Sequence, residues 1–196
     1  MKNQLANPLQ GLIAKAAGLP RHTGEVARSQ ERIARVNNRP TVVLADVSGS
    51  MESPAWGGRT KHAVLREAIA QTLLSDRHEL MAFAGHVTPL SSAENLPQPG
   101  GSTALDRALL AAIQRAPGRI LVISDGEPND EDAALAAAAQ FGGVIDVLYI
   151  GPDSNAAAMR FLQRLALAGH GRYHGSDIAR AGQPALVNTI QMLLPR

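Results

Sequence analysis

The sequence contains no cysteine and few aromatic side chains. Without cysteine the chain can form no disulfide, no zinc–thiolate site and no cysteine nucleophile. Aromatic residues make up only 3% of the 196 residues, so Ala, Val, Leu and Ile have to build the core. Those side chains suit helices that cover a parallel sheet better than they suit an aromatic-rich sandwich of strands.

The sequence also lacks a long apolar segment. No run approaches the roughly 20 apolar residues that a membrane span needs. The amino-terminal stretch MKNQLANPLQGLIAKAAG is interrupted by Asn, Pro, Gln, Gly and Lys, unlike the apolar core of a signal peptide. We therefore expect no membrane association and a cytoplasmic location.

Charge of either sign is close to balanced. The 19 basic and 17 acidic residues give a net charge of +2, which does not by itself indicate nucleic acid binding. The basic excess lies in residues 1–40, where seven basic residues accompany two acidic ones. We interpret this segment as an amino-terminal helical extension with helices at about Pro8–Gly18 and Gly24–Val36.

The second of these expected helices carries a basic stripe. Its members follow helical spacing and are Arg28, Arg32 and Arg35. A solvated helix face explains such a stripe, and a contact surface for an acidic partner or for phosphates is the alternative.

From Thr41 onward, short apolar runs alternate with helical stretches, which predicts one domain over residues 41–196. Strands are expected at Thr41–Asp46, Glu79–Val87, Thr88–Ser92, Arg119–Ser124, Val144–Ile150 and Gly171–His174. Helices are expected at Lys61–Ser75, Ala104–Ala116, Glu131–Phe141 and Asn155–Ala168, and within Asp177–Leu194 with an interruption near Gly182–Pro184.

Strands separated by helices indicate right-handed βαβ units and a parallel sheet. Too few residues separate the second and third expected strands for a crossover helix, so that pair should be antiparallel. The pattern therefore predicts an α/β fold of the doubly wound, Rossmann-like kind. It has a mostly parallel six-stranded sheet with one antiparallel edge strand and helices on both faces.

Polar side chains cluster in three loops of this predicted fold. The first strand runs into Asp46-Val47-Ser48-Gly49-Ser50, the loop before a long helix contains Thr103, and the strand Arg119–Ser124 is followed by Asp125. Ligands of such sheets bind outside the carboxyl ends of the parallel strands. We therefore expect the two carboxylates and the hydroxyls to meet on one edge.

Carboxylate and hydroxyl oxygens suit a hard cation. Mg²⁺ takes six oxygen ligands at about 2.0–2.1 Å and usually keeps several waters. Alternation puts Asp46, Ser48 and Ser50 on one side of an extended turn, and Gly49 permits tight curvature. Because most of these side-chain oxygens belong to neutral hydroxyls, we expect the ion to remain able to attract an external carboxylate. Mn²⁺ and Ca²⁺ are alternative ions.

These segments resemble a known family. DVSGSM at Asp46–Met51, Thr103 in GGSTALDRAL and Asp125 in ISDGEP look like the metal-ion-dependent adhesion site (MIDAS) of von Willebrand factor A (vWA) domains. All five ligand positions of that pattern are matched in order, and the resemblance covers roughly residues 41–196. A domain that kept the fold and lost metal binding is the alternative, but such relatives usually lack one or more of the five residues.

The resemblance implies a role for each of the five. Ser48 and Ser50 would coordinate the metal through their hydroxyls. Asp46 and Asp125 would bind directly or through waters, and Thr103 would move in or out of the shell with ligand state. A Glu or Asp of a partner protein typically fills the sixth position.

Three further residues flank the expected metal and are candidates for contacting the partner: Glu52, Trp56 and Glu127. An exposed tryptophan beside a binding site is a frequent interface anchor. Trp56 could equally tuck under its own loop, Pro54–Gly58.

The resulting hypothesis is a protein-binding module that captures an acidic residue of a partner and is not an enzyme. The resemblance is to intracellular prokaryotic members of the family, which commonly act as accessory or scaffold proteins beside AAA+ ATPases or in stress-response systems. A metal-dependent phosphoesterase is one alternative, although Ser48 replaces the second acid of a D-x-D phosphatase motif. A ribonucleoprotein component that uses the basic amino-terminal helix is the other.

Overall fold

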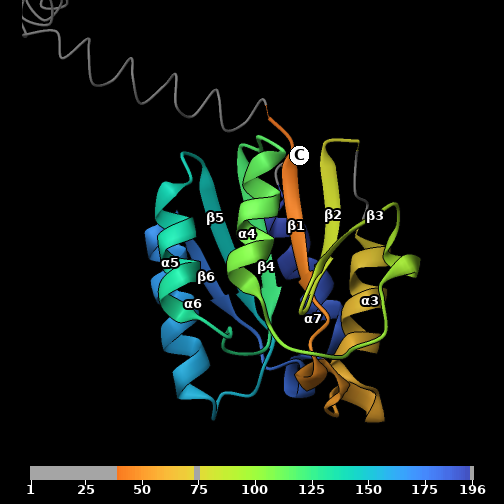
Figure 1. Cartoon of the computed structure of the whole chain (residues 1–196). Helices are drawn as coiled ribbons and strands as arrows, with labels where there is room; N and C mark the ends of the chain where they lie inside the picture. Colours follow the sequence, from red (N-terminus) through yellow and green to blue (C-terminus); the bar gives the residue numbers. More distant parts are fainter. Residues whose placement is uncertain (1–38, 73–75, 195–196) are drawn as a thin grey trace, which may run out of the picture. The chain divides into compact units, whose positions relative to one another are not determined.

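Six strands form one sheet within residues 39–72 and 76–194, which are the residues that the computed structural model describes. The strand order is β3-β2-β1-β4-β5-β6 (Figure 1). The strands are β1 (Thr41–Asp46), β2 (His78–Phe83), β3 (Val87–Leu90), β4 (Arg119–Ser124), β5 (Val144–Tyr149) and β6 (His170–Gly175). All neighbours are parallel except β2 and β3, so the predicted sheet with one antiparallel edge is confirmed.

One expected strand is wrong at its carboxyl end. The apolar run Glu79–Val87 predicts a single strand, but β2 ends at Phe83 and the chain reverses. The Ala84 N–H donates to the His86 carbonyl at 3.0 Å, and Val87 then pairs back with Phe83. The run is therefore the hairpin itself, because an apolar pattern without Pro does not reveal so short a turn.

The helices lie close to the expected ranges, and all but α4 begin at a side-chain cap. They are α3 (Lys61–Gln71), α4 (Leu105–Gln114), α5 (Glu131–Gln140), α6 (Ala156–Ala168) and α7 (Ile178–Leu193). Thr60, Asp130, Asn155 and Asp177 accept hydrogen bonds from first-turn amides of α3, α5, α6 and α7. Short 3₁₀ turns are η1 (Gly49–Glu52), η2 (Trp56–Gly58) and η3 (Ala93–Asn95). The two expected amino-terminal helices and the basic stripe lie outside the described residues.

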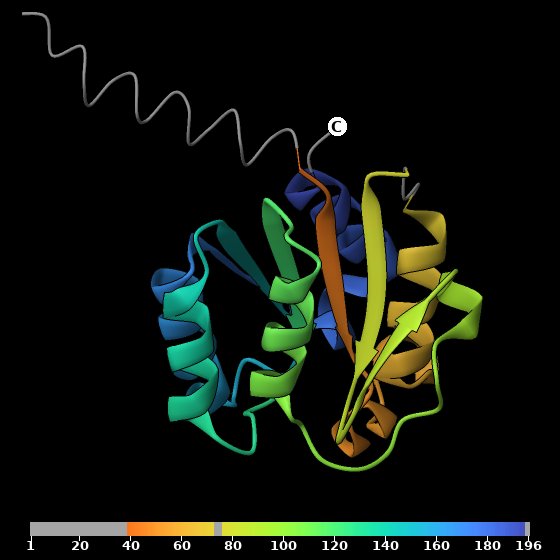
Figure 2. The same ribbon diagram turned by 45° about the horizontal axis from the view of Figure 1, so that its top comes forward.

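The helices form a layer on each face of the sheet (Figures 1 and 2). Alternate side chains of β1 separate the two cores: Val42 and Leu44 pack with α4, α5 and α6, whereas Val43 and Ala45 pack with α3 and α7. All six residues of β1 are buried, as expected for a strand covered on both faces. No helix in the described part of the chain is long and apolar enough to span a bilayer.

The predicted interruption of the last helix is confirmed at Gly182. This residue has φ +73°, so α7 is two helical pieces joined at a left-handed glycine. A side chain would also be crowded there, because an added Cβ would lie 3.2 Å from Cε2 of Trp56. The break therefore lets the η2 loop pack directly on α7.

A buried carboxylate ties β6 to the sheet. Asp146 in β5 has no exposed surface and forms ion pairs with Arg119 and Arg172. Its Oδ1 also accepts the Arg172 backbone N–H at 2.8 Å, beside the point where the β5–β6 register shifts. The carboxylate thus accepts a backbone N–H of the edge strand β6 where its pairing with β5 is irregular.

We expect Asp146→Ala to lower the free energy of unfolding by about 3–5 kcal/mol, since it leaves Arg119 largely buried without its partner. Asp153→Ala, which removes an ion pair with Arg180 whose side chains are 65% and 79% exposed, is the control and should cost less than about 1 kcal/mol. Urea unfolding measures both. Equal losses in the two variants would contradict a structural role for the buried pair.

Candidate functional site

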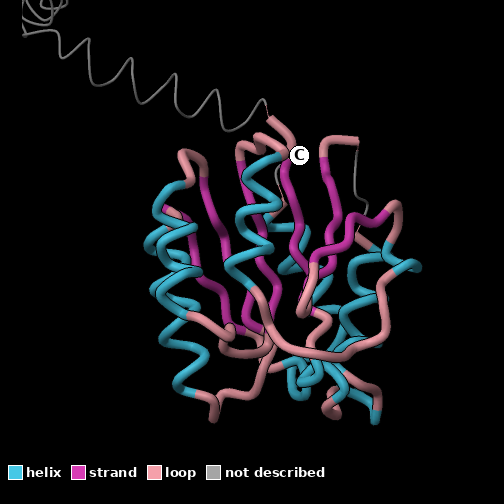
Figure 3. The backbone as a smooth tube through the Cα atoms, in the orientation of Figure 1, coloured by secondary structure: helices cyan, strands magenta, loops and turns pink. Residues whose placement is uncertain are grey.

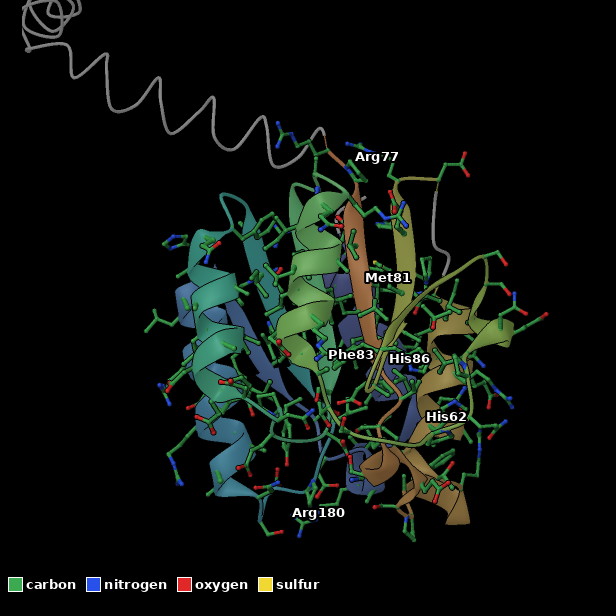
Figure 4. The ribbon with its side chains drawn as sticks, in the orientation of Figure 1. His62, Arg77, Met81, Phe83, His86 and Arg180 are labelled. Carbon is green, nitrogen blue, oxygen red and sulfur yellow. The ribbon has the colours of Figure 1, made fainter. Side chains whose placement is uncertain are left out.

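The candidate site lies where β1 and β4 end side by side. These strands are parallel neighbours, with Ala45 opposite Ile123. Asp46 ends β1, and Asp125 directly follows β4. Arg77 precedes β2 and Phe83 ends it, and their labels in Figure 4 identify the lower rim of the view as the carboxyl edge of the parallel strands.

Asp46 is held from two sides in the interior. Its Oδ1 accepts the Ser48 backbone N–H at 2.8 Å, and its Oδ2 accepts the Ser124 hydroxyl at 2.6 Å. The residue is fully buried, and burial is the main reason that its pKa rises to about 6. The charge of Asp125 adds to this rise, while the hydrogen bonds from Ser124 and Ser48 oppose it. Asp46 therefore fixes the conformation of the loop that follows it.

A chain of side-chain oxygens continues from this loop to β4. The Ser48 and Ser50 hydroxyl oxygens lie 3.1 Å apart, and Ser50 donates to Asp125 Oδ1 at 2.6 Å. Ser48 and Asp125 are buried, whereas Ser50 is exposed. The structure thus brings both expected serines and both expected carboxylates into one cluster that opens to solvent at Ser50.

Thr103 is held by backbone hydrogen bonds to Asn129, in the loop after β4. Its N–H donates to Asn129 Oδ1 at 3.0 Å, and its carbonyl accepts the Asn129 N–H at 2.9 Å. Two residues earlier, the Gly101 carbonyl accepts the Gly49 N–H at 3.2 Å. The loop that leads into α4 is therefore bound both to the loop after β1 and to the loop after β4, and it crosses the lower rim in Figure 3. Thr103 itself is half-buried.

Sequence reasoning missed two residues that contact the carboxylates. Ser124 binds Asp46 from the neighbouring strand, and its position at the end of a buried apolar strand is a signal that could have been used. Lys61 Nζ lies 2.5 Å from Asp125 Oδ2. Nothing in the spacing reveals this pair, because 64 residues separate the two partners.

The three candidate partner-contacting residues differ in their surroundings. Glu52 at the end of η1 and Glu127 after β4 are exposed. Trp56 is 43% exposed, and the indole rests on Gly182 of α7. Trp56 thus presents part of its ring to solvent, as an anchor would, but it is fixed by a contact with the last helix that the sequence does not reveal.

The donor set fits a hard divalent cation. Within the described residues no group of three or more His, Cys, Asp or Glu forms a metal cluster, so this site depends on hydroxyls. Its oxygens are the carboxylates and hydroxyls that Mg²⁺ accepts, and thiolate and imidazole ligands typical of zinc do not take part. The Lys61 ammonium places one positive charge against Asp125.

No family model and no curated protein matches the chain by sequence. Solved structures do match in fold. The SpRpn10 VWA domain has a TM-score of 0.59 at 16% identity, covering 77% of this chain and 94% of that domain. A conserved hypothetical protein, BatB from Bacteroides thetaiotaomicron, has a TM-score of 0.54 at 19% identity, covering 79% of this chain and 98% of that one.

A third similar structure is the vWF domain of the type V pili tip protein Mfa5 from Porphyromonas gingivalis. Its TM-score is 0.52 at 14% identity, and the match covers 80% of this chain and 96% of that domain. At these identities the likeness concerns the fold. The chain therefore has a vWA-type fold, as its sequence motifs predicted.

The raised pKa of Asp46 gives a pH dependence with a defined sign. A carboxyl that titrates near 6 when folded and near 3.8 when unfolded favours the folded state most below 3.8, and it loses this contribution as the pH rises through 6. In metal-free buffer we expect wild type to lose about 3 kcal/mol relative to Asp46→Asn between pH 3.5 and 7. Urea unfolding of both proteins across this range measures the difference. A difference that does not change with pH would contradict the prediction.

Proposed function

We propose that this chain is a metal-dependent protein-binding module. Ser48, Ser50 and Asp125, with Thr103 and Asp46, would hold one Mg²⁺ that captures an Asp or Glu side chain of a partner protein. The observation that carries the proposal is the continuous line of oxygens from Ser48 through Ser50 to Asp125, which is open to solvent at Ser50.

The charge balance of the site favours an acidic partner. Two carboxylates offset the two charges of a Mg²⁺ ion, and Lys61 adds one further positive charge beside Asp125. A loaded site would therefore carry a net positive charge on an edge that is partly exposed at Ser50. An incoming carboxylate would both complete the oxygen shell and neutralise that charge.

The residues of the candidate site have different roles in this proposal. A metal ion held by these residues would supply an electrophilic position for a carboxylate oxygen. Asp46, held by Ser124, orients the Ser48 backbone, while Ser48 and Ser50 present neutral oxygens. Glu52, Trp56 and Glu127, which follow Ser50 or Asp125 closely along the chain, would select the partner by charge and apolar contact.

The geometry supports binding better than phosphoester hydrolysis. Asp46, the acid at the position of a phosphatase nucleophile, is fully buried with both oxygens engaged by hydrogen bonds. The ribonucleoprotein alternative depends on the basic stripe, which lies outside the described residues. A role as an accessory or scaffold protein of an intracellular complex, beside an AAA+ ATPase or in a stress response, rests on the family resemblance.

Removal of the Ser50 hydroxyl tests whether the site binds a metal ion. We expect Ser50→Ala to weaken Mg²⁺ and Mn²⁺ binding roughly tenfold or more, because it removes one proposed ligand oxygen. Ser50 is exposed, so the substitution should leave the core intact. Ser102→Ala is the matched control, since it removes a nearby exposed hydroxyl outside the proposed set. Isothermal titration calorimetry measures both. Equal affinities in Ser50→Ala and Ser102→Ala would contradict the assignment.

Two matched peptide libraries test whether the site prefers a carboxylate ligand. A displayed library in which each random sequence carries one central Glu is compared with the same library carrying Gln. We expect enrichment of Glu peptides in Mg²⁺, loss of that enrichment with EDTA, and loss in Asp125→Asn. Selection of Gln peptides at the same frequency, or enrichment that survives EDTA, would contradict capture of a carboxylate.

A further inference from the structure

Asp125 has both of its oxygens occupied by other side chains of the protein. Ser50 donates to Oδ1 at 2.6 Å, and the Lys61 ammonium lies 2.5 Å from Oδ2. The side chain of Asp125 is 1% exposed and that of Lys61 is 11% exposed, so this ion pair is largely shielded from water. A carboxylate buried to this degree is costly unless a positive charge accompanies it.

The position of Lys61 is fixed by the same loops that build the site. Lys61 is the first residue of α3, after the cap residue Thr60, whose side chain accepts the Ala63 N–H at 3.1 Å. The Lys61 backbone N–H donates to the carbonyl of Ser53, immediately after η1, at 3.0 Å. The start of α3 is therefore attached to the loop that carries Ser48 and Ser50, and the ammonium points from it to Asp125.

Lysine is a rare choice in this chain. The sequence has three lysines, and Lys61 is the only one after residue 15; the other basic residues of the domain are arginines. An ammonium is a compact point charge on a flexible stem, whereas an arginine fork binds a carboxylate through two parallel hydrogen bonds. A lysine therefore neutralises Asp125 and can still release it.

We propose that Lys61 is a built-in counter-cation that occupies Asp125 when the site holds no metal and that an incoming divalent ion displaces. This inference rests on the proposed function and adds a residue that sets metal affinity. The ammonium keeps the empty site folded by pairing the buried carboxylate. The metal has to break this pair and then shares the site with the displaced charge, so Lys61 lowers the affinity for the ion.

Calorimetry with Mn²⁺ on four proteins tests the competition. We expect Lys61→Met to bind Mn²⁺ about tenfold more tightly than wild type, because it removes both the competitor and the repulsion. Lys61→Arg should bind no more tightly than wild type, since it keeps the charge. Arg66→Met removes an exposed charge from the same helix and should stay within about twofold, as expected for a screened surface charge.

A second measurement reports on the lysine itself. Acetylation of wild type by N-hydroxysuccinimidyl acetate, quantified by mass spectrometry and normalised to Lys2 and Lys15, follows the release of the Lys61 amine. We expect slow labelling without metal and several-fold faster labelling with saturating Mn²⁺. Thermal unfolding checks the fold of Lys61→Met, which should be less stable than wild type without metal and recover with Mn²⁺.

The outcomes separate the two proposals. If wild type binds Mn²⁺ but Lys61→Met binds it equally or more weakly, the proposed counter-cation role of Lys61 is wrong and the proposed metal site stands. If calorimetry shows that Mn²⁺ binds but the rate of Lys61 acetylation does not change, the proposed counter-cation role is also wrong. If neither wild type nor Lys61→Met binds Mn²⁺, the proposed function fails together with this inference. Tight binding by Lys61→Met alone would support the competition.

Discussion

The parallel pairing of β1 with β4 is the constraint on which the rest of the site depends. It places Asp46 and Asp125 at the ends of adjacent strands, where both are buried. Two buried like charges destabilise the fold unless hydrogen bonds or cations accompany them. The contacts from Ser48 and Ser124 to Asp46, and from Ser50 and Lys61 to Asp125, offset that cost.

The two carboxylates are stabilised in different ways. Asp46 is enclosed by the Ser48 amide and the Ser124 hydroxyl, and it supports the conformation of a loop. Asp125 instead accepts from the hydroxyl of Ser50, an exposed residue, and pairs with the Lys61 ammonium. One carboxylate thus organises the edge, and the other is paired with a cationic side chain.

Much of this arrangement follows from sequence alone, because its causes are local. The buried strand Thr41–Asp46 and the capped helices follow from periodicity and from end residues. The site residues follow from the rule that parallel strands end at one edge. The hairpin at Ala84–His86 does not, because an apolar run through a short turn looks like one strand. The contacts of Lys61 with Asp125 and of Trp56 with Gly182 join distant segments, and only the folded chain reveals them.

The most direct measurement of the central claim is a crystal structure grown with Mn²⁺, with diffraction recorded at the manganese absorption edge. We expect one anomalous peak within bonding distance of the Ser48 and Ser50 hydroxyl oxygens, with Lys61 moved away from Asp125. Crystals that hold Mn²⁺ elsewhere or nowhere, with the Lys61–Asp125 pair intact, would contradict the account.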